Sequence, residues 1–150
     1  MSGDIRRLTQ PLSTPYLGDL RRWARSWMER YPNNADPDSV VLALTELVSN
    51  AVRHGAAPVD VELSADDRSL LLQVSDCSDD LPRQLRGDHS WSGGRGMIVI
   101  DALASRWGVQ FRSDVGKTVW CEFRPRHRSS PDPAGPPNPK RHYRQSVRAG

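Results

Sequence analysis

Glu46 and Asn50 stand one helical turn apart in the string ELVSNAVRHG, inside a segment that otherwise has the spacing of an apolar helix face. Side chains four residues apart on a helix project as neighbours. The amide oxygen of Asn50 suits Mg²⁺, which binds few protein groups and keeps waters and phosphates as its other ligands. The carboxylate of Glu46 could orient or deprotonate a hydroxyl group or a water molecule. Taken alone, the pair is more simply explained as a solvated helix face.

Further polar residues have the chemistry of a phosphate or nucleotide site. Asp76 closes an apolar strand, where its carboxylate could accept a hydrogen bond from an exocyclic amine, although aspartates also commonly begin turns. Arg53 and His54 follow at the end of the helix that carries Asn50, and they could place positive charge near phosphates.

Glycine-rich turns mark two more positions. The string SGGRGM puts Gly93, Gly94 and Gly96 before an apolar helix, where bare backbone can approach a phosphate and the N–H groups of the helix start favour anions. It is neither a GxGxxG nor a Walker A sequence, and a flexible helix start is the alternative. The string GKTVW puts Gly116 and Thr118 at the turn into the last strand, where an ordinary hairpin turn is the alternative.

The elements that must position these residues follow from apolar spacing and from turn signals. Asp36 and Pro37 are typical of a helix start, and Gly55 is expected to end that helix in a left-handed conformation. The predicted order is a strand within 5–12, helices over 14–31 and 36–54, strands over 59–64 and 69–75, a helix over 93–106, and strands over 107–113 and 117–123. Hairpins separated by helices predict an α+β fold, a two-layer α/β sandwich with a mixed, mostly antiparallel sheet and three main helices.

The C-terminal part of the chain differs in composition from the rest. Residues 124–150 hold seven Lys or Arg against one Asp, and six of the twelve prolines. Residues 124–150 therefore have a net charge of +6. The whole chain has a net charge of +3, so residues 1–123 have a net charge of −3. We expect a folded domain over 1–123 and a disordered, basic, Pro-rich tail over 124–150. The tail could grip nucleic-acid phosphates, but a solubilising role is the simpler explanation, so no direct nucleic-acid binding is expected.

Cysteine usage and apolar runs indicate the compartment. Cys77 and Cys121 are too few for a disulfide scaffold and lack the short spacing of metal ligands. The N-terminal segment has no signal-peptide core, and the longest apolar run, VVLAL, is too short to cross a bilayer. We expect a cytoplasmic protein that does not enter a membrane.

The order of the motifs is more specific than any one of them. E-x-x-x-N on a helix, D-x-S after a hairpin, G-G-R-G-M before a helix and G-K-T entering the final strand together resemble the GHKL ATPase superfamily. Within it, the chain is similar to the short histidine-kinase-like ATP-binding domains of bacterial anti-sigma-factor serine kinases, over roughly residues 5–123. The resemblance implies a Bergerat-type ATP-binding fold, in which ATP and Mg²⁺ lie between the helices and the sheet.

The resemblance also implies a role for each matching residue. Asn50 would coordinate Mg²⁺, and Glu46 would be the general base that activates the attacking hydroxyl group. Asp76 would accept a hydrogen bond from the adenine amine, and Thr118 would lie near the adenine end. The phosphate-facing turn would consist of Gly94, Arg95, Gly96 and Met97.

The implied protein is an anti-sigma factor that is also an ATP-dependent protein serine/threonine kinase. Its partners would be a sigma factor and a small antagonist protein that bears the acceptor serine, and the family's behaviour suggests a homodimer. The chain departs from the family at CSDDLPRQL, where glycines often follow the adenine aspartate, and in its short segment before Gly93. These departures leave an alternative open, a catalytically silent switch whose partner binding depends on nucleotide.

The first helix presents an Arg-rich face that includes Arg21, Arg22 and Arg25. Such a face is usually just solvated, and the alternative is a surface that docks an acidic partner.

Overall fold

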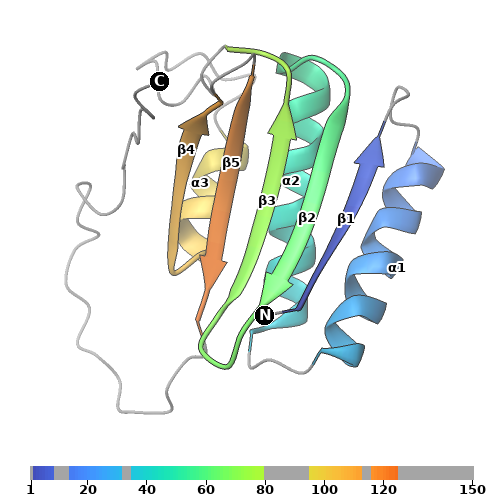
Figure 1. Ribbon diagram of the computed structural model, residues 1–150, viewed down its shortest axis with the longest axis vertical. Coiled ribbons are helices and arrows are strands. Elements are labelled where there is room, and N and C mark those ends of the chain that lie inside the picture. Colours follow the sequence, from blue (N-terminus) through green and yellow to red (C-terminus); the bar gives the residue numbers. More distant parts are fainter. Residues whose placement is uncertain (1, 9–13, 32–34, 80–94, 113–115, 125–150) are drawn as a thin grey trace.

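The structure, a computed structural model, describes residues 2–8, 14–31, 35–79, 95–112 and 116–124 (Figure 1). Its elements in chain order are β1 (Ser2–Leu8), α1 (Thr14–Arg30), α2 (Pro37–His54), β2 (Val59–Ala65), β3 (Leu70–Asp76), α3 (Arg95–Leu103), β4 (Arg106–Phe111) and β5 (Lys117–Phe123). The strands form one five-stranded sheet in the order β1-β2-β3-β5-β4. Helices α2 and α3 lie against one face of this sheet, with α1 beside α2 (Figure 1). The predicted two-layer α+β fold is confirmed.

Strand direction differs from the expectation of a mixed sheet. All four pairings between the described strands are antiparallel. The reason is the path of the chain after β3, because α3 leads back toward the opposite end of the sheet before β4 begins (Figure 1). β4 then runs in the direction of β3, and β5 returns between the two, antiparallel to both.

The ends of α2 follow local sequence signals. The carboxylate of Asp36 caps the helix by accepting hydrogen bonds from the Ser39 N–H at 3.1 Å and from Ser39 Oγ at 2.6 Å. At the other end, the Gly55 N–H donates to the carbonyl of Ala51 at 2.9 Å. Gly55 has φ −95° and is extended, so the predicted left-handed conformation is wrong. The missing side chain instead permits close packing against Asp76.

Two other elements differ from their predicted extents. β1 begins and ends earlier than the predicted segment 5–12 and pairs with β2 over its whole length, while residues 9–12 lie outside the described residues. α3 is shorter than the predicted helix over 93–106. It ends before Ser105, whose N–H donates to the carbonyl of Glu122 at 2.8 Å and so joins the β4–β5 hairpin.

The core lies between the sheet and the helices. Alternate residues of β3 and β5 point into it, so that Leu72 and Val74 stand opposite Cys121 and Val119. Each fully buried aliphatic side chain contributes about 1.5–3 kcal/mol to folding. A shift of either strand by one residue would turn these side chains to the outer face, so the apolar alternation fixes the register.

The three arginines of the α1 face each have a partner within the chain. Arg21 Nε donates to Thr45 Oγ1 of α2 at 3.1 Å, and Arg25 forms an ion pair with Asp38 at 2.6 Å. Arg22 pairs with an acidic residue one turn earlier in its own helix. This face therefore helps to join α1 to α2, in addition to being solvated.

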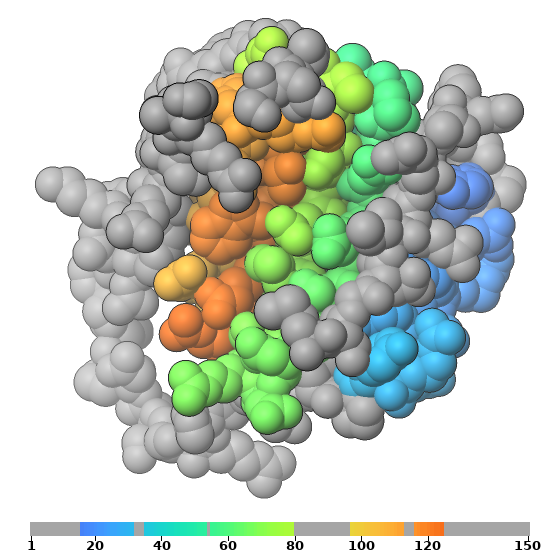
Figure 2. Space-filling view, in the orientation of Figure 1, coloured from blue at the N-terminus to red at the C-terminus, as the bar shows by residue number. Residues whose placement is uncertain are grey.

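The outer face of the sheet is visible in Figure 2, where side chains of β2, β3 and β5 reach the surface. Trp120 lies against Gly108 of the neighbouring strand, where a Cβ would come within 2.8 Å of the indole ring. A hollow of about 360 Å³ on this face is lined by residues that include Gln73, Arg106 and Trp120. None of the site residues predicted from the sequence lines this hollow.

Candidate functional site

Four segments of the chain come together at one end of the fold. Helix α2 and strand β3 end there, and β5 and α3 begin there (Figure 1). The antiparallel ladder explains this, because the start of β5 must lie beside the end of β3. Residues that the sequence singled out in separate motifs are thereby brought to the same end of the molecule.

Asp76 is the last residue of β3 and is 2% exposed, and its ladder partner Lys117 is the first residue of β5 and is 4% exposed. Lys117 Nζ lies 3.0 Å from each carboxylate oxygen of Asp76 and donates to the carbonyl of Ser78 at 3.3 Å. The Ser78 N–H donates to Asp76 Oδ1 at 2.8 Å. Buried charges are tolerated when they are paired and hydrogen-bonded, and this arrangement provides both.

Gly55 places bare backbone directly against this carboxylate. A Cβ at Gly55 would come within 2.7 Å of Asp76 Cγ and 2.8 Å of Oδ2, and it would also meet the carbonyl of Ala51. Any other residue would therefore have to displace the buried carboxylate or the helix end. One residue further on, the carbonyl of Ala56 accepts a hydrogen bond from the Cys77 N–H at 2.8 Å, which ties the end of α2 to the end of β3.

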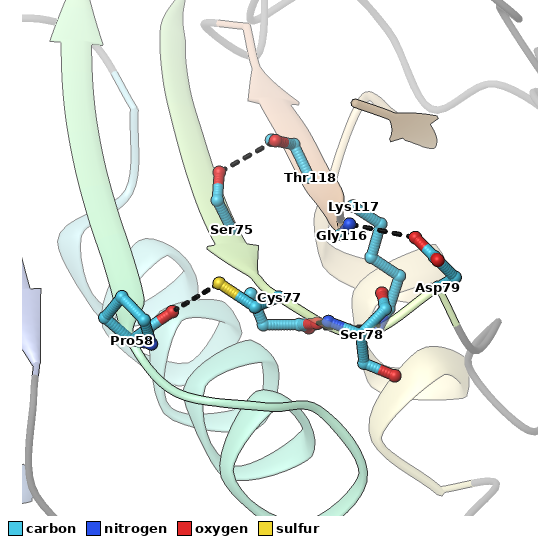
Figure 3. Close-up of polar contacts among 9 residues, drawn as sticks. Pro58, Ser75, Cys77, Ser78, Asp79, Gly116, Lys117 and Thr118 are labelled. Atoms are coloured by element: carbon cyan, nitrogen blue, oxygen red, sulfur yellow. Dashed lines mark hydrogen bonds and ion pairs between the residues drawn. The ribbon is translucent and has the colours of Figure 1, made fainter. Parts of the chain in front are cut away.

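The start of β5 is tied to the same place. Gly116 has φ +109°, a conformation that favours glycine, and a Cβ there would meet the backbone of Asp76. The Gly116 N–H donates to Asp79 Oδ1 at 2.9 Å (Figure 3). The end of α2, the end of β3 and the start of β5 thus form one hydrogen-bonded unit, which we call the Asp76 junction.

Sequence motifs did not single out Lys117, because GKTVW drew attention to its glycine and threonine. Thr118 Oγ1 lies 2.7 Å from Ser75 Oγ in a hydrogen bond on the outer face of the sheet (Figure 3). Successive strand residues point to opposite faces, so the side chains of Thr118 and Asp76 are not brought together. The two-residue period of a strand could have identified Lys117. Its side chain lies in the same buried row as that of Val119, and a buried lysine requires an acidic partner.

Glu46 and Asn50 are both half-buried and lie one turn apart on α2, as predicted. Thr45 marks the flank that faces α1, and Asn50 lies about 140° further round the helix axis, away from that flank. Along the axis, Asn50 is about 7.5 Å and Glu46 about 13.5 Å from Gly55. The amide and the carboxylate therefore lie progressively further from Asp76, toward the middle of the helix.

The glycine-rich turn before α3 is described only in part. Gly94 lies outside the described residues, and α3 begins with the backbone of Arg95 and Gly96. The side chain of Met97 is 1% exposed and belongs to the core, so this residue can offer a ligand only its backbone. The first N–H groups of a helix have no partner within it, and the positive end of the helix dipole attracts anions.

Arg53 and His54 close α2 beside Gly55. Arg53 is exposed, and both residues belong to the end of the fold that holds the Asp76 junction. They are therefore placed within the same region as the other predicted site residues.

The two thiols of the described chain are free and differ in their surroundings. Burial raises the pKa of the Cys121 thiol to about 12, because the ionised form loses its hydration inside the core. Cys77 is half-buried, and its Sγ donates to the carbonyl of Pro58 at 3.8 Å (Figure 3). The thiols lie in different environments and are expected to react differently.

Two features are absent from the described residues. Within the described ranges, no group of three or more His, Cys, Asp and Glu side chains is placed to hold a metal ion. Nor does the described part of the chain contain a helix whose length and apolarity would suffice to span a membrane.

Comparison with known proteins gave two matches of different kinds. Residues 11–123 match the family model of the histidine kinase-like ATPase domain. Among solved structures, the RsbU and RsbW domains of Rv1364c from Mycobacterium tuberculosis share the fold with a TM-score of 0.55 and 21% sequence identity. That match covers 81% of this chain but 33% of the other, so this chain spans about a third of its length. No curated protein matches the chain closely enough to count as a relative.

Proposed function

This chain belongs to the histidine kinase-like ATPase domain family, and we propose that it is an ATP-binding anti-sigma factor with protein serine/threonine kinase activity. The acceptor would be a serine on a small antagonist protein, and the second partner would be a sigma factor. The observation that carries the proposal is Asp76, a carboxylate buried at the end of the fold where α2 and β3 end and α3 begins. The sequence order of Glu46, Asn50 and Asp76 supports the anti-sigma-factor kinase branch.

Asp76 would bind the base. An ionised carboxylate offers about four acceptor positions on two oxygens and no donor. It therefore matches the exocyclic amine of adenine, which donates. The ion pair with Lys117 and the contact with Gly55 hold this carboxylate in one orientation.

The phosphates would lie between α2 and the start of α3. The half-buried Asn50 is displaced from the base position along α2, and its amide oxygen is a hard ligand that suits Mg²⁺. A single protein ligand fits this ion, because Mg²⁺ usually keeps waters and substrate phosphates. When bound, the ion would neutralise charge on the phosphates. The backbone N–H groups at Arg95, Gly96 and Met97 would face the phosphate oxygens, with Arg53 and His54 adding positive charge.

Glu46 would act on the serine of the antagonist protein. Its carboxylate lies one turn beyond Asn50 and is half-buried, so it can be close to the terminal phosphate without contacting the base. As the serine oxygen attacks, Glu46 would accept the hydroxyl proton. Phosphoryl transfer otherwise depends on positioning and charge neutralisation, which the amide and the helix N–H groups would provide.

The test combines binding and transfer. Calorimetry with Mg·ATP should show binding, and incubation with γ-labelled ATP and candidate antagonist proteins should label a serine. Glu46→Gln should bind Mg·ATP with nearly the same affinity and transfer no label. Labelling that survives this substitution would remove Glu46 from its role, and absence of Mg·ATP binding by the unaltered protein would refute the nucleotide site.

The chain after Asp76 favours a second candidate, a nucleotide-dependent switch without phosphoryl transfer. Where glycines often follow in the family, the carbonyl of Ser78 is bound by Lys117 and the carboxylate of Asp79 by Gly116. These contacts hold the segment against β5. The switch predicts Mg·ATP binding that Asp76→Ala abolishes, with no label transferred to any partner.

The protein would act in the cytoplasm as a homodimer and would contact its sigma factor directly rather than DNA. Light scattering of the full chain should give twice the monomer mass of 16.8 kDa. A monomer at micromolar concentration would contradict the dimer while leaving the nucleotide site intact.

A further inference from the structure

We propose that Lys117 sets the base preference of the nucleotide site by holding Asp76 as a charged group that only accepts hydrogen bonds. The inference rests on the proposed ATP site and adds to it a positioning residue that no motif identified. Its starting point is the pairing of the two side chains as the last rung of the β3–β5 ladder, with both side chains directed toward the helix layer.

Lys117 is buried and committed to oxygen atoms of the protein. An ammonium group has three N–H donors. Three oxygens lie around Nζ, the two carboxylate oxygens of Asp76 at 3.0 Å and the carbonyl of Ser78 at 3.3 Å. The contact with the carbonyl of Ser78 fixes the ammonium group on the side of β3. Lys117 therefore acts through Asp76 and does not contact the base itself.

The carboxylate of Asp76 has few hydrogen-bond acceptor positions left for a ligand. Oδ1 accepts from the Ser78 N–H at 2.8 Å and from Lys117, so both of its lone-pair positions are used. Oδ2 lies 3.0 Å from Lys117 Nζ, and its second lone pair has no donor among the described residues. Gly55 lies close to the same oxygen, where a Cβ would come within 2.8 Å of it. The junction thus presents one acceptor position in a fixed direction.

This single acceptor discriminates between bases. The amine at C6 of adenine donates a hydrogen bond to it. The carbonyl at C6 of hypoxanthine or guanine would instead bring an acceptor against an ionised acceptor, and a site built around a hydrogen bond rejects the analogue that lacks it. Lys117 makes this rejection possible because its charge stabilises the ionised carboxylate in a buried position.

Removal of the ammonium group should relax the preference. A carboxyl group buried without a counter-charge is stable only in the neutral form. A neutral carboxyl group has an O–H donor in addition to its acceptor, so it can bind either an amine or a carbonyl. Lys117→Met, which keeps the length of the side chain and removes its charge, should therefore admit 6-oxo bases.

The experiment compares ATP with ITP, whose base differs at C6 by a carbonyl in place of the amine. Calorimetry with the magnesium complexes should show that the unaltered protein prefers ATP by about ten- to a hundredfold. Lys117→Met should bind ATP more weakly, and the ratio of its ATP affinity to its ITP affinity should be near one. Ser75→Ala, which removes a hydrogen bond one residue away on the outer face, should keep the original preference.

A second variant tests the same role if Lys117→Met fails to fold. Asp76→Asn combined with Lys117→Met leaves no buried charge, and an amide carries both a donor and an acceptor, so this variant should also lose the preference. Circular dichroism should confirm that it is folded. If either folded variant keeps the original preference for ATP, the role of Lys117 is overturned while the ATP site stands. If the unaltered protein binds neither nucleotide, the proposed function fails together with this inference.

Discussion

Asp76 and Lys117 form an ion pair with 3.0 Å from the ammonium nitrogen to each carboxylate oxygen, inside a protein whose other described ion pairs involve more exposed side chains. The pair ends a buried row in which every other member is apolar on β3 and β5. Burial of such a pair removes two charged groups from water, which costs free energy. This cost is a reason to assign the pair a role in the site rather than in stability alone.

The stability of the pair can be measured by a double-mutant cycle. Asp76→Asn or Lys117→Met should each lower the free energy of unfolding by about 3–5 kcal/mol, because each leaves the other ionisable group buried without its counter-charge. The double variant should recover much of that loss. Urea unfolding gives the three values, and strictly additive losses would show that the two side chains do not interact in solution.

Gly55 should be intolerant of even a methyl group. Gly55→Ala should lower the free energy of unfolding by about 1–3 kcal/mol, because the new Cβ would lie 2.7 Å from Asp76 Cγ. It should also weaken Mg·ATP binding by displacing the carboxylate. Gly18→Ala is the matched control in the interior of α1, where the nearest atom to a new Cβ is an Arg22 nitrogen at 3.8 Å. This control should stabilise the protein by about 1 kcal/mol, and a similar gain at Gly55 would contradict the packing described.

Asn50 should carry the magnesium dependence of nucleotide binding. Asn50→Ala removes the amide oxygen, so the gain in ATP affinity on adding Mg²⁺ should fall by about tenfold or more. Calorimetry with magnesium and with EDTA measures that gain. Ser49→Ala, one position earlier and also half-buried, should keep it. An unchanged magnesium effect in Asn50→Ala would place the ion elsewhere.

The two thiols should react at different rates. Because burial raises the pKa of Cys121 to about 12, its thiolate is scarce and inaccessible, so iodoacetamide should label Cys77 first in the folded protein. Mass spectrometry of digested protein identifies the labelled site, and both thiols should react equally in urea. Rapid labelling of Cys121 without denaturant would show that the core is open at β5.

The same shift makes stability depend on pH. Below the ordinary Cys pKa of 9.0, the thiol is protonated in both the folded and the unfolded chain, so its contribution is constant. Between 9.0 and about 12 only the unfolded chain loses the proton, so the free energy of unfolding should fall as the pH rises. Cys121→Val should show a smaller fall in urea unfolding between about pH 8 and about pH 10.5. Equal slopes would mean that Cys121 is less buried in solution.

Elements with strong local signals were predictable from the sequence. The cap at Asp36 and the glycine after His54 predicted the ends of α2 to within one residue, and apolar runs between turn signals predicted β3 and β5 to within one residue. Such signals act through neighbours in sequence, so they survive without knowledge of the fold. The antiparallel pairing of β5 with β3 could not be read in this way, because it depends on where α3 returns the chain.

The candidate site was only partly predictable for the same reason. Glu46, Asn50 and Asp76 could be singled out because their motifs are local, and their roles stay predictions. Lys117 was missed because its importance depends on a pairing between strands 41 residues apart. The role of Gly55 was also misjudged, since a helix-ending glycine and a glycine beside a buried carboxylate look identical in sequence. The proposed phosphate-facing residue Gly94 lies outside the described residues and stays a prediction.

The position of β5 between β3 and β4 has a consequence for how the protein is made. β5, the last strand of the described residues, occupies the interior of the sheet, so a nascent chain lacking it would expose the adjoining edges of β3 and β4. Until residues 117–123 have emerged from the ribosome, β4 has no partner among the described strands and the Lys117 contact cannot form. The chain should therefore acquire its ligand-binding competence in a single late step of biosynthesis rather than gradually.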